Sequence, residues 1–291
     1  MAYPDGLREQ VDRYLAGLEF SSRSSTEGLQ EAMRYSLLAG GKRIRPVLCL
    51  ATALAIGADP GRFLPTAAAL ELIHTYSLIH DDLPEMDDDD LRRGMPTSHV
   101  EFGENVAILA GDGLFAEAVH LLCSAQEGEP ETIVAVVAEL MAAAGVDGMV
   151  GGQFLDVAGP PDRPADEGLL REIHSLKTGR LIGASIGAVL TLEKVGESAK
   201  MAYTEYATEL GVLFQIVDDI LDVTGSDDEL GKPSGSDERH GKLTYVSLHG
   251  LEGARALADE SHRRALEALG QANPQTTELE GITNFIHTRE S

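Results

Sequence analysis

The chain has 291 residues, and its 23 Lys and Arg against 48 Asp and Glu give a formal net charge of −25. This charge disfavours nucleic acid and anionic membrane surfaces as partners, because their phosphates would be repelled. No apolar run approaches the roughly eighteen residues of a membrane span, and the first residues lack a signal-peptide pattern. We therefore expect a soluble cytoplasmic protein whose cysteines, Cys49 and Cys123, are reduced thiols in the core.

The predicted elements are helices throughout. Ser24 and Glu27 form a capping-box pattern ahead of an apolar helix that stops at Gly40. Apolar periodicity predicts further helices over roughly 7–19, 45–57, 64–82, 104–124, 130–158, 166–190, 197–222 and 252–269. The run TIVAVVAELMAAAG has the β-branched residues of a buried strand, but its length and alanines favour a helix. We expect one all-α domain over 1–291, a bundle of long helices whose longest irregular segment is 223–241.

The stretch QIVDDILD lies in the helix predicted over 197–222. It places Gln215, Asp218 and Asp222 on one helix face, with Asp219 beside them. Carboxylates four residues apart repel each other, and the neighbouring residues are strongly apolar, so an ordinary solvated surface is disfavoured. A hard cation relieves both the repulsion and the cost of burial. The motif therefore predicts a metal or polyphosphate site.

A second acidic stretch, IHDDLPEMDDDDLRRG, follows an apolar helix. Asp81 ends that helix and Pro84 interrupts it, so a kink or loop can bring Asp87 back toward Asp81. His74, two turns earlier on the same face, is either a satisfied core histidine or a phosphate contact. The aspartates at 88–90 are more typical of solvated loop charge. The alternating ligands and central glycine of an EF-hand are missing.

The scarce cations cluster in short glycine-containing motifs. These are GGKRIRP, LRRG, HSLKTGR, ELGKP and RHGKLTY, which supply Lys42, Arg43, Arg45, Arg92, Arg93, Lys177, Thr178, Arg180, Lys232 and Lys242. Lysine and arginine beside flexible glycines suit phosphate oxygens, so with the aspartates they predict a pocket for magnesium and diphosphate. A P-loop enzyme is disfavoured, because Lys42, Lys232 and Lys242 lack the following Ser or Thr and no parallel sheet is predicted.

The motifs GGKRIRP, DDLPEMD, RRG, GQFLD, KTG, FQIVDDILD and GKP occur in the order found in trans-isoprenyl diphosphate synthases. The sequence resembles this family, and most strongly its bacterial farnesyl and geranylgeranyl diphosphate synthases, from about residue 30 to about residue 250. The resemblance implies an all-α fold around a central cavity, a homodimer, and Mg²⁺ as cofactor. The implied reaction joins an allylic diphosphate to isopentenyl diphosphate, so the partners would be small-molecule isoprenoid diphosphates.

The resemblance also assigns roles by position. Its implied metal ligands are Asp81, Asp87 and Asp218, supported by Asp82, Asp219 and Asp222. Isopentenyl diphosphate would be bound by Lys42, Arg45, His74 and Arg93, and the allylic diphosphate by Arg92, Lys177, Lys232 and Lys242. Lys177, Thr178 and Gln215 would lie near the developing carbocation. Gln153 and Asp156 of GQFLD would lie near the metal site, although ordinary helix polar groups are the alternative for this pair.

The implied chemistry fits these residue types. Ionising an allylic carbon–oxygen bond requires a neutralised leaving diphosphate, which magnesium and lysines supply electrostatically. The cation then alkylates the double bond of isopentenyl diphosphate, and a proton is lost. No strongly basic side chain stands out as its acceptor, so we expect the departing diphosphate to take the proton.

Product length depends on residues just before Asp81. Tyr76, together with the two extra residues of DDxxxxD, resembles farnesyl synthases, in which an aromatic ring is the floor of the chain cavity; this favours a C15 product. The smaller Ser77 projects closer to the Asp81 face and leaves a C20 geranylgeranyl product as the alternative. A class I terpene cyclase is disfavoured by the isopentenyl diphosphate residues, and a non-catalytic subunit of a heteromeric synthase by both intact aspartate motifs.

Overall fold

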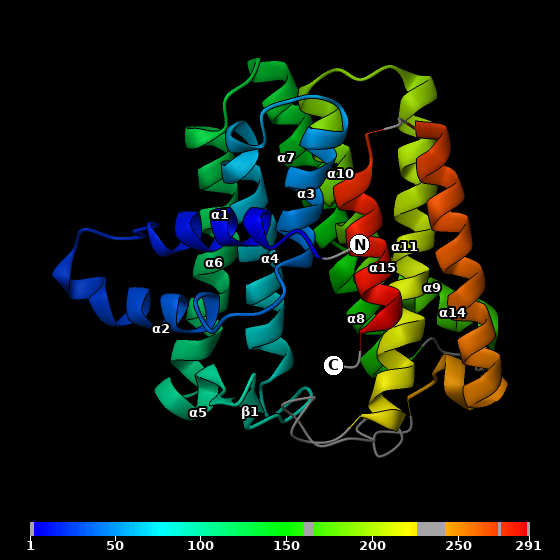
Figure 1. Cartoon of the computed structure of the whole chain (residues 1–291). Coiled ribbons are helices and arrows are strands. Elements are labelled where there is room, and N and C mark those ends of the chain that lie inside the picture. Colours follow the sequence, from blue (N-terminus) through cyan, green and yellow to red (C-terminus); the bar gives the residue numbers. More distant parts are fainter. Residues whose placement is uncertain (1–2, 160–165, 226–241, 273–274, 290–291) are drawn as a thin grey trace.

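The computed structural model describes residues 3–159, 166–225, 242–272 and 275–289, and their regular structure is helical apart from one two-stranded hairpin (Figure 1). The helices are α1 (Asp5–Ala16), α2 (Glu27–Leu37), α3 (Ile44–Ala55), α4 (Leu64–Asp81), α5 (Ser98–Phe102), α6 (Glu104–Ala125), α7 (Pro130–Ala144), α8 (Met149–Ala158), α9 (Glu167–His174), α10 (Arg180–Leu192), α11 (Glu197–Thr224), α14 (Tyr245–Ala272) and α15 (Thr277–Thr288). A π-helical turn, Ser175–Gly179, joins α9 to α10, and β1 (Leu91–Arg92) pairs with β2 (Met95–Pro96). The predicted all-α fold is confirmed.

Helix α4 organises the bundle. It packs against α3 and α6, while α10 packs against α3, α7 and α11, and α11 against α14. Every residue of α4 from Pro65 to Ile73 is buried, and its alanines let neighbouring helices approach closely. Each fully buried leucine or isoleucine contributes about 1.5–3 kcal/mol. The ends of α4 and α11 that carry the aspartate motifs lie at the same end of the bundle (Figure 1).

Several predicted boundaries were wrong. The stretch 130–158 is two helices, because the chain turns sharply between Gly145 and Gly148, where a Cβ on Gly148 would lie 2.1 Å from the Ala143 carbonyl oxygen. The capping box at Ser24 does not form: Ser24–Thr26 is a 3-10 turn, and α2 begins at Glu27 without a side-chain cap.

The C-terminal third is more helical than the sequence predicted. Helix α14 begins at Tyr245 and bends at Gly250, whose φ of 68° interrupts the helical backbone. Helix α15 was not predicted, since TELEGITNFIHT is short and mixes apolar with acidic residues. The segment predicted to be irregular, 223–241, lies mostly outside the described residues.

The expectation that both cysteines lie in the core was wrong for Cys123. Cys49 is buried, but Cys123 is exposed, because α6 buries Leu114, Ala118 and Leu122 and leaves Cys123 on its outer side. By length and composition alone, two stretches could cross a membrane, contrary to the expectation that no apolar run has this length. They are Glu104–Ala125 and Pro130–Ala158, and the second of them is divided into α7 and α8 by the turn at Gly145–Gly148. A core helix of a soluble protein has the same composition, and these helices pack in the bundle, so this is weak evidence for a span.

Candidate active site

The first aspartate motif closes on itself just after α4. The backbone N–H of Asp87 donates to the Asp81 carbonyl oxygen at 2.9 Å, so the turn through Pro84 brings the two residues together as predicted. The Gln153 amide of α8 donates to Asp81 Oδ1 at 2.8 Å. Burial raises the pKa of Asp81 to about 6, against the opposing charge of Lys177, so this carboxylate sits where a cation would stabilise its charged form.

Asp82 is engaged differently from Asp81. It is buried, and its carboxylate accepts from Arg92 Nε at 2.8 and 2.9 Å and also from Arg92 Nη2. The β1–β2 hairpin presents this arginine, because Arg93 and Gly94 both have positive φ, as a tight two-residue turn requires. In this arrangement Arg92 and Asp82 neutralise each other at the edge of the first motif.

Two lysines pair with Asp156 of α8, and one of them also reaches the first motif. Lys177 Nζ lies 2.7 Å from Asp156 Oδ2, while Lys242 Nζ lies 3.2 Å from Asp87 Oδ1 and 3.7 Å from Asp156 Oδ2. Burial alone would raise the pKa of Asp156, but Lys177 and its hydrogen bond hold that pKa below its usual value. Asp156, whose alternative from sequence was an ordinary helix polar group, therefore pairs with both lysines, and Lys242 links it to Asp87.

The π-helical turn presents Lys177 and Thr178. Such turns insert one extra residue into a helix and are frequent at functional sites. A Cβ on Gly152 would lie 2.2 Å from the Lys177 backbone nitrogen, so glycine lets α8 and the turn approach closely. Thr178 Oγ1 donates to Gln215 Oε1 at 2.6 Å, which ties the turn to α11 one turn before Asp218. The predicted carbocation-facing residues are thus brought together.

The second aspartate motif has a partner that sequence reasoning missed. Arg289, just after α15, donates to Asp218 and to the Phe214 carbonyl oxygen at 3.2 Å, and its guanidinium lies over the Phe214 ring. Asp219 is buried and accepts from the Tyr245 backbone N–H at 2.7 Å, so it caps the start of α14. Asp222 is buried on the same helix. No spacing in the sequence links Arg289 to QIVDDILD.

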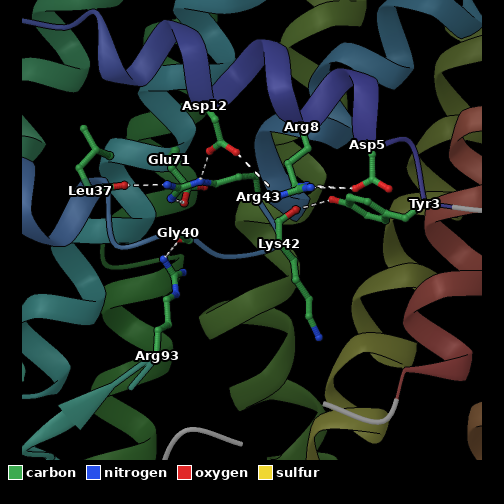
Figure 2. Close-up of polar contacts among 10 residues, drawn as sticks. All are labelled: Tyr3, Asp5, Arg8, Asp12, Leu37, Gly40, Lys42, Arg43, Glu71 and Arg93. Carbon is green, nitrogen blue, oxygen red and sulfur yellow. Dashed lines mark hydrogen bonds and ion pairs between the residues drawn. The ribbon is translucent and has the colours of Figure 1, made fainter. Parts of the chain in front are cut away.

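A loop of unusual backbone carries Lys42, one of the predicted isopentenyl diphosphate residues, and Arg93, another of them, contacts this loop (Figure 2). Gly40 and Gly41 have φ of 85° and 117°, and Arg43 has φ of 53°. Arg93 donates to the Gly40 carbonyl oxygen, and a Cβ on Gly41 would lie 2.6 Å from the Arg93 guanidinium carbon. The loop therefore requires glycine both for its conformation and for the approach of Arg93.

Arg43 proves to be structural. Its buried guanidinium lies 2.5 Å from Glu71 and 3.0 Å from Asp12, and it donates to the Leu37 carbonyl oxygen at 2.8 Å (Figure 2). Truncating one partner of such a buried pair typically costs about 3–5 kcal/mol.

His74 lies among positive charges. Burial, and then Arg45 and Arg93, lower its pKa well below the usual value, so the imidazole is neutral. Arg45 is itself buried, and its Nε has no hydrogen-bond partner within the described part of the chain. A buried, incompletely partnered guanidinium favours an anion at this position. Of the predicted binding residues, Lys232 lies outside the described residues.

The predicted floor residue packs against a ring from another helix. Tyr76 is 9% exposed, and its ring meets that of Phe115 on α6 edge-on at 5.1 Å. Ser77 donates to the His74 carbonyl oxygen of its own helix at 2.9 Å. Phe115 was not singled out from sequence, because its relation to Tyr76 exists only through the packing of α4 on α6.

Magnesium is compatible with these residues. Across the described ranges, no three histidine, cysteine or carboxylate side chains are arranged to hold a metal, and protein cations contact Asp82, Asp87 and Asp218 instead. The donor set consists of carboxylate oxygens, which Mg²⁺ prefers. The raised pKa of Asp81 indicates a need for positive charge there.

The all-α bundle brings two aspartate motifs to one end of the fold, where cationic side chains contact the carboxylates, Lys242 at Asp87 and Arg289 at Asp218. The chain belongs to the polyprenyl synthetase family, whose model matches residues 26–286, and is therefore a prenyltransferase. This confirms the family predicted from the motifs.

Relatives and solved structures agree with this assignment. The chain is 46% identical over 270 residues to geranylgeranyl pyrophosphate synthase 11, chloroplastic, of Arabidopsis thaliana, covering 90% of this chain and 75% of that protein. An FPP/GFPP synthase structure from Zymomonas mobilis is 35% identical, with a TM-score of 0.86, covering 98% of this chain and 97% of the other. A geranyltransferase structure from Helicobacter pylori, complexed with magnesium and isoprenyl diphosphate, is 32% identical, with the same TM-score and coverage.

Proposed function

We propose that this chain, as a single domain over 1–291, is a magnesium-dependent trans-isoprenyl diphosphate synthase that condenses isopentenyl diphosphate with an allylic diphosphate. The observation that carries the proposal is the pairing of aspartates with cations from distant segments. Asp87 and Asp156 share Lys242, Asp156 also holds Lys177, and Asp218 holds Arg289. Metal ions would take the place of the cationic side chains at the carboxylates, and the diphosphate would take the place of the carboxylates at the cationic side chains. Each charged group would then still face a group of opposite charge.

The site residues form two sets, one proposed to bind the allylic diphosphate and the other isopentenyl diphosphate. Asp81, Asp87 and Asp218 would hold magnesium, with Asp82, Asp219 and Asp222 in supporting positions. The magnesium would neutralise the allylic diphosphate as it leaves. Lys177, Lys242 and Arg92, with Lys232, would bind that diphosphate, and Lys42, Arg45, His74 and Arg93 would bind isopentenyl diphosphate. The Thr178–Gln215 hydrogen bond would place oxygen atoms near the developing allylic cation.

The proton lost after condensation is proposed to go to the departing diphosphate. The neutral His74 lies among arginines, on the side proposed for isopentenyl diphosphate, and its lowered pKa makes it a poor base. If neutralising a nearby side chain halted elimination while leaving ionisation intact, this route would be wrong.

The relatives support a C20 product more than the predicted C15 product. The Arabidopsis relative is named a geranylgeranyl pyrophosphate synthase, and we propose geranylgeranyl diphosphate as the main product. Farnesyl diphosphate is the second candidate, because the Tyr76 and Phe115 rings together narrow the space between α4 and α6.

We propose a homodimer. Its support is that α6 exposes Ile108 and Leu109 and that α8 exposes Val150, Phe154 and Val157, which are apolar side chains that a second copy would cover. Light scattering at micromolar concentration tests this assembly. A cytoplasmic location stays a prediction from sequence, because the Arabidopsis relative is named chloroplastic.

The function is tested with radiolabelled isopentenyl diphosphate, magnesium, and dimethylallyl, geranyl or farnesyl diphosphate in turn. Dephosphorylated products are separated by chain length. Extension to C20 supports the proposal, and arrest at C15 supports the second candidate. A cyclic hydrocarbon would indicate a terpene cyclase. Condensation only after addition of a second protein would indicate a non-catalytic subunit.

A further inference from the structure

The Gly40–Arg43 loop, which precedes α3, is held in place by side chains from outside it. With three left-handed residues it cannot form a regular backbone ladder. Around it, the carbonyl oxygens of Leu37, Gly40 and Lys42 accept from Arg43, Arg93 and Tyr3 respectively. The position of Lys42 therefore depends on groups far away in the sequence (Figure 2).

Tyr3 contacts the Lys42 backbone directly and its side chain indirectly, through the ring of Phe285. Its hydroxyl donates to the Lys42 carbonyl oxygen at 2.5 Å, across 39 positions of sequence. Its ring packs against Phe285 of α15, with centroids 4.7 Å apart, and the Lys42 ammonium lies 5.2 Å from the centroid of that same Phe285 ring. Burial raises the pKa of Tyr3 above its usual range, so the hydroxyl remains a hydrogen-bond donor.

Helix α1 secures the next residue of the loop as well. Asp12 of α1 lies 3.0 Å from Arg43, which also pairs with the buried Glu71 of α4. These ion pairs fix Arg43, and the Tyr3 hydrogen bond fixes the carbonyl group of Lys42. The Lys42 backbone therefore has little freedom to rotate. A lysine side chain has considerable rotamer entropy, so fixing its backbone and its ammonium lowers the cost of binding a diphosphate.

We propose that Tyr3 is a positioning residue that presents Lys42 to isopentenyl diphosphate. This inference rests on the proposed function, which assigns Lys42 to that substrate. Tyr3 does not contact the reacting atoms. It acts through the Lys42 backbone and through the Phe285 ring, so its loss should weaken binding of isopentenyl diphosphate. Binding of the allylic diphosphate should be spared, because its proposed lysines include Lys177 of the π-helical turn and Lys242, just before α14, which contact Asp156 and Asp87.

The test is Tyr3→Phe, which removes the hydroxyl and keeps the ring against Phe285. We expect KM for isopentenyl diphosphate to rise about five-fold, the effect of losing one hydrogen bond. The KM for the allylic diphosphate and kcat should stay within about two-fold, because chemistry is untouched. Tyr14→Phe is the matched control, since this tyrosine of α1 makes no hydrogen bond to the described Gly40–Arg43 loop.

A double-mutant cycle separates positioning from a general structural role. In a Lys42→Gln background, Tyr3→Phe should no longer change KM for isopentenyl diphosphate, because the ammonium through which it acts is gone. An unchanged KM in the single variant, or equal rises for both substrates, would overturn the inference. Failure of the wild-type chain to condense any pair of substrates would instead overturn the proposed function, so the two failures are distinguishable.

Discussion

Arg289 and Asp218, 71 positions apart, form an ion pair at the second aspartate motif. Arg289 is nearly buried, while Asp218 is 43% exposed, so the arginine reaches the carboxylate from the protein side and leaves its other side open. The pair holds the C-terminal end of α15 against α11. It also gives Asp218 a counter-charge that magnesium has to displace or share.

Replacing Arg289 by Gln should therefore change the magnesium requirement. Since a partly exposed ion pair is worth about 1 kcal/mol, we expect half-maximal activity at a magnesium concentration about two- to five-fold lower. The measurement is a magnesium titration of initial rate at saturating substrates. Arg255→Gln is the control, because Arg255 pairs with Glu252 on the exposed side of α14. An identical titration curve for Arg289→Gln would show that the pair does not compete with the metal.

The aspartates of the first motif should differ in how much each contributes to kcat. Asp81→Asn should lower kcat by about 10²-fold or more, because Asp81 is proposed to hold the magnesium that neutralises the leaving diphosphate. Asp88→Asn is the matched control: Asp88 is exposed and has a φ of 53°, a conformation that asparagine tolerates. Steady-state rates at saturating magnesium compare the two. Equal losses would mean that the run of aspartates acts as a general charged surface.

The Tyr76 ring should limit product length. Tyr76→Ala opens the space beside Phe115, and we expect longer products, with a loss of stability of about 3 kcal/mol from the cavity. Product chain length by mass spectrometry after dephosphorylation is the measurement. Tyr76→Phe keeps the ring and should keep the product. An unchanged distribution for a folded Tyr76→Ala variant would remove Tyr76 as the limiting residue.

The two loop glycines should differ in their response to alanine. Both have positive φ, which costs a non-glycine residue about 1–2 kcal/mol. Gly41→Ala also places its Cβ 2.6 Å from the Arg93 guanidinium carbon, whereas Gly40 has open space around it. Gly41→Ala should thus be the less stable variant in denaturant and should raise KM for isopentenyl diphosphate. If Gly40→Ala were instead the less stable variant, the loop would be constrained by its backbone conformation alone and not by the approach of Arg93.

Acid should destabilise the protein partly through His174. Burial lowers the pKa of this histidine to about 4, below its value of about 6.5 in the unfolded chain, so its contribution to stability is present above pH 6.5. As pH falls from about 6.5 to about 4, the unfolded chain gains a proton that the folded chain does not, and the free energy of unfolding decreases by up to ~1.4 kcal/mol per pH unit.

His174→Phe should flatten that decrease in urea titrations between pH 6.5 and 4.5. Asp81 acts in the opposite sense, because its folded pKa is raised, but it is the same in both proteins and cancels in the comparison. Parallel pH curves for the two proteins would exclude His174 as a contributor.

The sequence by itself determined the all-α class, because uninterrupted apolar periodicity leaves little choice of local structure. It also located both aspartate motifs, since carboxylates close together among apolar residues repel each other and are costly to bury in any fold unless a cation is bound. The turn at Pro84 was predictable for the same local reason: proline cannot continue α4, and the backbone hydrogen bond between Asp87 and Asp81 closes the resulting turn.

Only the tertiary structure decided which cation meets which carboxylate. Arg43 resembled the diphosphate residues beside it, yet it is buried against Glu71 and Asp12. Asp219 sits in a predicted metal motif, yet it caps α14. Arg289 and Tyr3 belong to no motif, and their partners lie 71 and 39 positions away. An ion pair or hydrogen bond forms over only a few ångströms, so its partner is set by how helices pack, which local periodicity does not encode.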